Sequence, residues 1–136
     1  MKVINFKLLI VSIILIASNS FAQQKSVRLE LTIKVDNIEI PDTSYVLDII
    51  NYNTFVDTHV KVSNVFILYL DYNTEFEISV SYKGTNIKSI IVNTTAPEDD
   101  WYVISIINLN TDNNKRILIG GIKYDEELET FKKYKY

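Results

Sequence analysis

The stretch that decides the fold is VRLELTIKVD at residues 27–36, in which apolar and polar side chains alternate without a break. A period of two over such a length is typical of a β-strand with one buried and one solvated face. EFEISVSY at residues 75–82 repeats the pattern. The two segments predict a shared core that contains Leu31, Ile33, Phe76, Ile78 and Val80.

Further segments have the length and composition of strands and are separated by short polar turns, at 45–52, 55–62, 65–70, 87–94, 101–109 and 116–124. The segment at 65–70 is apolar on both faces, which predicts a central or covered strand. Short strands at regular spacing indicate an all-β domain, either a seven- or eight-stranded antiparallel β-sandwich or a small barrel.

The tail and the turns complete this prediction. Residues 125–135 fit a helix, because acids precede lysines, or a final strand that carries Phe131, and we favour the strand. The chain has only 3 glycines and 2 prolines, so Asn and Asp are expected at many turns. Gly120 and Gly121 lie inside a predicted strand, where they indicate a β-bulge.

Residues 1–22 have the features of a cleavable secretory signal peptide. Lys2 and Lys7 precede an apolar stretch at 8–17, and Ser20 and Ala22 are small residues at the −3 and −1 positions. The stretch is about half the roughly 20 residues that a membrane-spanning helix needs. We therefore expect export, residues 23–136 as a single domain without stable membrane insertion, and a periplasmic, secreted or cell-surface location.

Composition excludes several classes of function. Cysteine is absent, which excludes disulfides, cysteine nucleophiles and thiolate metal sites. Removing two signal-peptide lysines and no acid takes the net charge from −3 to −5. Proteins that bind nucleic acid carry basic surfaces, so nucleic acid is not an expected partner. No glycine-rich phosphate loop is present, and we expect no cofactor and no bound metal.

His59 is the single histidine. Asp57 lies two residues away on the same face of a predicted strand, so a local hydrogen bond explains the pair more simply than a zinc site does. The sequence contains no G-x-S-x-G nucleophile elbow. We expect that the domain has no catalytic activity and that His59 is dispensable. A small secreted hydrolase built around His59 is the alternative.

The second candidate region is the segment from Glu98 to Tyr102. Asp99 and Asp100 belong to a short acidic run without the alternating spacing of dedicated calcium loops. Trp101 and Tyr102 follow directly and would offer an aromatic platform to a sugar or peptide, whereas a core tryptophan at the start of a strand is the simpler interpretation. The candidate ligand-binding residues are Asp99, Asp100, Trp101 and Tyr102.

Several short motifs resemble one known family. EFEI at 75–78, the KG turn at 83–84, KSIIVNT at 88–94, and GIKYD at 121–125 followed by Phe131 are similar to carboxypeptidase-regulatory-like domains of exported Gram-negative envelope proteins. The resemblance implies a transthyretin-like (prealbumin-like) sandwich. A hydrolase branch of that fold uses several histidines, and this chain has one.

Export, strand pattern and resemblance together predict a non-enzymatic binding or structural module of the cell envelope. The expected partner is an envelope protein, which would pair with an exposed strand edge. A carbohydrate-binding module that uses Trp101 and surface tyrosines is the alternative of another class.

The signal peptide generates the first testable prediction. We expect cleavage between Ala22 and Gln23, because signal peptidase requires small residues at −3 and −1. Intact-mass measurement of the exported protein checks this, and a chain that still begins at Met1 or Lys2 would contradict it.

Overall fold

The computed structural model describes residues 26–51, 54–98, 100–111 and 115–136, so the predicted signal peptide lies outside the described residues. Within those ranges the chain forms nine strands and no helix. They are β1 (Ser26–Val35), β2 (Ser44–Asn51), β3 (Thr54–Val62), β4 (Val65–Asp71), β5 (Glu75–Tyr82), β6 (Thr85–Asn93), β7 (Tyr102–Leu109), β8 (Ile117–Asp125) and β9 (Thr130–Tyr134).

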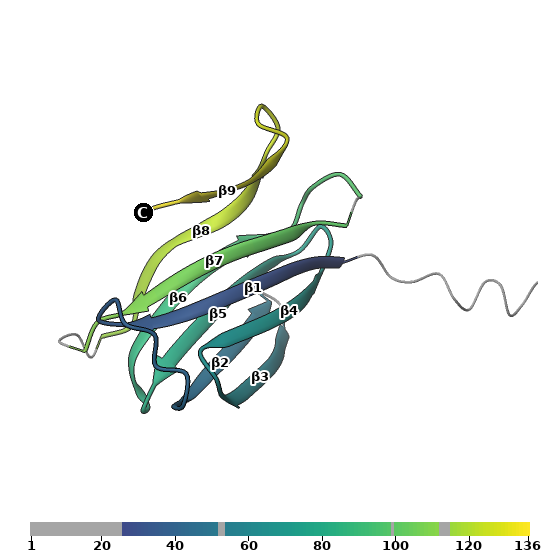
Figure 1. Cartoon of the computed structure of the whole chain (residues 1–136). Coiled ribbons are helices and arrows are strands. Elements are labelled where there is room, and N and C mark those ends of the chain that lie inside the picture. The colour runs from purple at the N-terminus through teal and green to yellow at the C-terminus, as the bar shows by residue number, and fades with distance from the viewer. Residues whose placement is uncertain (1–25, 52–53, 99, 112–114) are drawn as a thin grey trace, which may run out of the picture.

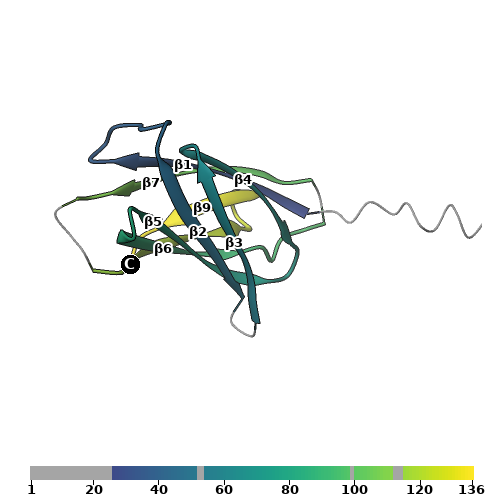
Figure 2. The ribbon, with the colours of Figure 1, turned by 90° about the horizontal axis from the view of Figure 1, so that it is seen from below.

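The strands form two sheets (Figures 1 and 2). The small sheet has the order β4-β1-β7, and the large sheet has the order β3-β2-β5-β6-β8-β9. Their apolar inner faces contribute to one hydrophobic core, which contains Leu29 and Leu31 of β1 together with Leu47 and Ile78 of the large sheet. The all-β class is therefore confirmed.

The expected antiparallel arrangement and strand number are wrong. Both sheets are mixed, since β1 pairs in parallel with β7, and β6 with β8. The cause is the path of the chain. It leaves the large sheet after β6, forms β7 in the small sheet and returns as β8, so β6 and β8 run in the same direction. The tail adds β9 as an antiparallel partner of β8, which confirms the strand interpretation and brings the described strands to nine.

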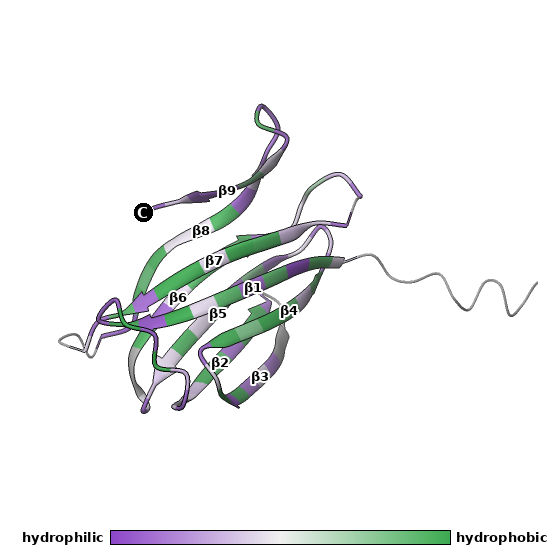
Figure 3. Ribbon diagram, viewed as in Figure 1, coloured by the Kyte–Doolittle hydropathy of each residue, from purple (hydrophilic) through white to green (hydrophobic). Residues whose placement is uncertain are grey.

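The predicted core is confirmed. Leu31, Ile33, Phe76, Ile78 and Val80 are all buried, and none is more than 4% exposed. In β1 every second residue is buried, because its neighbours β4 and β7 cover its edges and the large sheet covers its inner face. Figure 3 shows the resulting alternation of apolar and polar residues along β1.

The prediction for β4 is wrong. We expected this strand to be central or covered, but it forms an edge of the small sheet. Phe66, Leu68 and Leu70 point into the core, whereas Ile67 and Tyr69 are 43% and 68% exposed on the other face. Apolar side chains on both faces of a strand do not require that both faces be covered inside one chain.

Turns and bulges follow the predicted chemistry. Asp36, Asn37 and Asn73 have positive φ angles, which Asn and Asp tolerate better than most residues. The β6–β8 register shifts between Leu118 and Gly120, as expected for a bulge. Gly120 has a φ of 140°, and an added Cβ would overlap the Tyr134 carbonyl oxygen. β9 can therefore approach β8 only if this position is glycine.

The core predicts a large effect of truncating Phe76. Phe76→Ala should lower the free energy of unfolding by about 3–5 kcal/mol, because it leaves a cavity as well as losing burial. Val62→Ala is the control, since Val62 is 68% exposed and should cost no more than about 0.5 kcal/mol. Urea titration of both variants checks the prediction, and a loss below about 1 kcal/mol for Phe76→Ala would contradict it.

Candidate binding surface

The outer face of the small sheet exposes an unusual amount of apolar surface. Ile67 and Tyr69 lie on β4, and Tyr102, Ile104 and Ile106 lie on β7, each between 43% and 68% exposed. We call these five residues and the β1 side chains between them the outer face. Two apolar ridges thus flank the central strand. Figure 3 shows the hydropathy along β4 and β7, with the residues of the inner face included.

A polar stripe runs between the ridges along β1. The Tyr102 hydroxyl donates a short hydrogen bond to the Glu30 carboxylate, and the Arg28 guanidinium lies 4.6 Å from the centre of the Tyr102 ring. The Arg28 Nε atom is buried without an acceptor, and no carboxylate in the described ranges forms an ion pair with this side chain. Farther along β1, Lys34 is already paired with Glu39, at 3.7 Å between Nζ and Oε1.

This composition suits contact with protein. Large exposed apolar patches mark interaction sites, and Tyr and Arg are among the residues that dominate protein–protein binding energy. A guanidinium that rests on an aromatic ring is held in place for an incoming acceptor. The stripe places polar and charged groups at the centre of an otherwise apolar surface.

Trp101 and Tyr102, the two residues of the predicted aromatic platform, lie in different environments. Tyr102 belongs to the outer face, whereas Trp101 packs against Tyr124 and Phe131 at centroid distances of 5.2 and 5.5 Å with edge-on geometry. The Trp101 indole nitrogen donates to the Pro97 carbonyl at 2.9 Å. Trp101 thus connects Pro97 to the β8–β9 hairpin. A shallow hollow of about 400 Å³, lined by Tyr124, Pro97 and four further residues, lies beside this cluster.

The acidic run contributes less to a site. Asp100 is exposed, and Asp99 lies outside the described residues. Within the part of the chain that the structure describes, no three His, Asp or Glu side chains lie close enough to hold a metal ion.

His59 lies on β3, which is an edge strand of the large sheet. The neighbouring edge strand of the small sheet is β4, and residues of both strands line a cleft. The His59 Nε2 atom is 3.1 Å from the Asp57 carboxylate, so the two side chains share one face of β3, as expected. Both line this cleft of about 260 Å³, whose walls include Phe76, Leu70 and Asp71. Among the described residues that line this cleft there is no serine, threonine or lysine, whereas Thr58 and Lys61 line a second hollow that His59 also borders.

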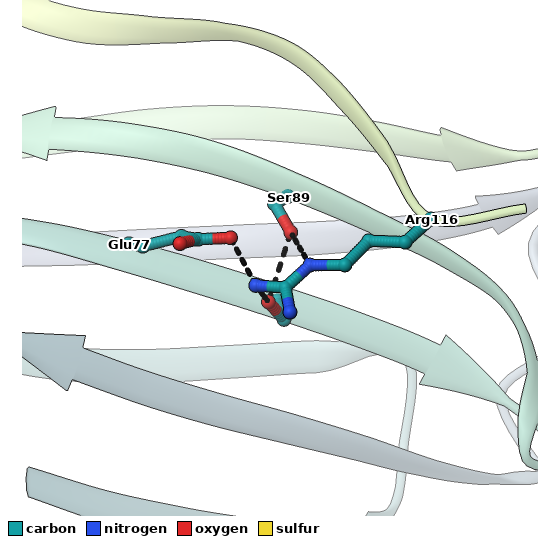
Figure 4. Close-up of polar contacts among 4 residues, drawn as sticks. Glu77, Ser89 and Arg116 are labelled. Atoms are coloured by element: carbon teal, nitrogen blue, oxygen red, sulfur yellow. Dashed lines mark hydrogen bonds and ion pairs between the residues drawn. The ribbon is translucent and has the colours of Figure 1, made fainter. Parts of the chain in front are cut away.

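A further polar cluster, on the solvent side of the large sheet, is not predicted by the sequence (Figure 4). Arg116, just before β8, reaches back over β6 and β5 and contacts Glu77, Ser79 and Ser89. The two buried serine hydroxyls are also 2.9 Å from each other. The cluster fastens the start of β8 to the sheet. Glu77 and Arg116 are 39 residues apart in the sequence, so local sequence patterns do not predict the cluster.

Comparison with known proteins finds no family model and no curated protein that matches this chain. The solved structure of S.CueP is similar over 60% of this chain, with 13% sequence identity and a TM-score of 0.46. This chain spans 62% of the length of that protein. Within the ranges described, no helix has the length and hydropathy needed to cross a membrane.

The hydrogen bond in the polar stripe predicts the titration of Tyr102. The bond to Glu30 and burial raise the pKa of Tyr102 above its ordinary value of 10.0. Because the raised pKa belongs to the folded state, the stabilisation that this bond gives is complete below pH 10 and is lost as pH rises through the folded pKa. Neutralising the carboxylate in Glu30→Gln weakens the bond and should lower the Tyr102 pKa.

NMR of ring-labelled tyrosine between about pH 8 and about pH 12 measures this effect, with Tyr102→Phe identifying the signal. A Tyr102 midpoint at or below the ordinary value, or no change in Glu30→Gln, would contradict the hydrogen bond.

Proposed function

We propose that this protein is an exported, non-enzymatic module of the cell envelope that binds a protein partner through the outer face of its small sheet. The observation that carries the proposal is the exposure of Ile67, Tyr69, Tyr102, Ile104 and Ile106 on a single face. A chain without cysteine has no disulfides to offset the cost of exposed apolar surface. Covering that face with another protein stabilises it.

The edges of the small sheet support the same proposal. Among the described strands, β4 and β7 pair only with β1, so each has one free backbone edge. A partner that lies across the outer face can therefore continue into strand addition at either edge. The partner's contact surface should be apolar and carry a carboxylate for Arg28.

The export signal and the family resemblance give the proposal its cellular setting. We propose a periplasmic, secreted or cell-surface location on the basis of residues 1–22, and a transthyretin-like sandwich related to carboxypeptidase-regulatory-like domains on the basis of the motifs at 75–94 and 121–131. Two sheets that share one core are compatible with that architecture.

A hydrolase built around His59 is the second candidate, because the cleft beside β3 and β4 holds the His59–Asp57 pair. Among the described residues that line it, Asp57 and Asp71 carry the carboxylates that would act beside His59, as a nucleophile or as a base for water. His59→Ala and wild type should give equal rates on panels of ester, amide and glycoside substrates. Hydrolysis that wild type performs and His59→Ala abolishes would overturn the non-enzymatic proposal.

A carbohydrate-binding module is weaker as an alternative. The Trp101 ring packs within a cluster of three aromatic rings, and its N–H group already donates to Pro97. Binding of a glycan that is lost in Trp101→Ala while binding through the outer face persists would establish it as a separate activity.

The proposal predicts position-specific crosslinking. A photo-crosslinking residue at position 104 should form protein adducts in cells that export the chain, whereas the same residue at position 62 should not. Both side chains are exposed, at 57% for Ile104 and 68% for Val62, but only position 104 lies on the outer face. Adduct bands in denaturing gels provide the measurement. Equal adducts from both positions, or none from position 104, would contradict the proposal.

A further inference from the structure

The outer face has a pattern that repeats on both sides of β1. At the level of Arg28, the neighbours across the sheet are Tyr69 on β4 and Tyr102 on β7. At the level of Glu30, the neighbours are Ile67 and Ile104. One level therefore carries a cation between two tyrosines, and the next carries a carboxylate between two isoleucines.

These two levels are complementary to each other. Consider a second copy turned over by a two-fold axis that lies between the two faces, perpendicular to the strands, at the level of Leu29. The two β1 strands then run antiparallel, and each level of one copy faces the other level of its mate. Tyrosines meet isoleucines on both sides, and Arg28 of each copy meets Glu30 of the other.

We propose that the partner of the outer face is a second copy of this chain, bound through that two-fold arrangement. The inference rests on the proposed function and names the partner for the same surface. A two-fold interface makes every contact twice, so the pairing of Arg28 with Glu30 occurs at two places. Sheets pack face to face about 10 Å apart with strands within about 30° of each other, which is compatible with this register.

The charges favour a second copy over an unrelated partner. The centre of the face presents one cation and one carboxylate on adjacent levels of β1, so a partner with charge of one sign would meet attraction at one level and repulsion at the next. The Arg28 guanidinium has no ion pair within the described residues, although it rests on the Tyr102 ring. In the two-fold arrangement the Arg28 guanidinium pairs with the Glu30 carboxylate of the second copy. The Tyr102 hydroxyl of each copy keeps its hydrogen bond to the Glu30 carboxylate of the same copy.

Charge reversal tests the register directly. Analytical ultracentrifugation of the purified exported chain should show a monomer–dimer equilibrium. Arg28→Glu makes two carboxylates face each other across the interface, and Glu30→Arg makes two guanidinium groups do so. Each variant should therefore raise the dimer dissociation constant at least about tenfold, or about 1.4 kcal/mol. An equimolar mixture of the two variants should form a heterodimer, because all facing charges are again opposite.

The combined variant Arg28→Glu/Glu30→Arg should regain the dimer for the same reason. Lys133→Glu is the matched control, since it changes the charge by the same amount as Arg28→Glu at an exposed position of β9, and it should leave the dissociation constant unchanged. Thermal unfolding of each variant, monitored by circular dichroism, establishes that the fold is intact.

The outcomes separate this inference from the proposed function. A dimer that the mixture and the combined variant restore supports the two-fold register. The inference that the partner is a second copy is overturned if the protein is a monomer at all concentrations. It is also overturned if the single variants dimerise as well as wild type. In either case, adducts from position 104 with a different protein retain the proposed function, whereas the absence of adducts from that position overturns both.

Discussion

The structure depends on the burial of one face of β1. Leu29, Leu31 and Ile33 are fully buried, and their strand is the centre of the small sheet that covers the inner face of the large one. With no disulfide available, this contact between sheets is what converts strands into a stable domain, because burial of apolar area is the main favourable term in folding. Both β4 and β7 hold their positions by pairing with β1.

The period of two along β1 and β5 is sufficient to predict strands, facing and core residues. Side-chain alternation is local information, so it survives in a single sequence. The parallel pairings are not predictable in this way, because they depend on where the chain crosses between sheets. Strand β4 shows the same limit: its outer isoleucine and tyrosine suggest a covered strand, and only the strand order reveals that they form an exposed edge.

The candidate surface is predictable in part from sequence. The sequence singles out Tyr102, but as one half of a platform with Trp101, and successive residues of a strand point to opposite faces. Its actual partners, Arg28 and Glu30, lie more than 70 residues away in sequence. Arg116 likewise joins a cluster that only the folded sheet assembles. Such groups can be identified only once the pairing of the strands is known, because that pairing brings residues distant in sequence side by side.

The outer face also explains a conflict in the sequence. A small sheet needs apolar residues only on its inner face, and its outer face can be polar. Strand β1 follows this pattern, since its outward residues are polar. Strands β4 and β7 instead carry tyrosine and isoleucine outward, although polar side chains there would leave the inner face unchanged and lower the risk of aggregation. The inner-face requirement therefore does not account for these residues. Apolar residues that lie in register on two separate strands, around a centre with charges of both signs, are the features on which the proposed protein contact rests.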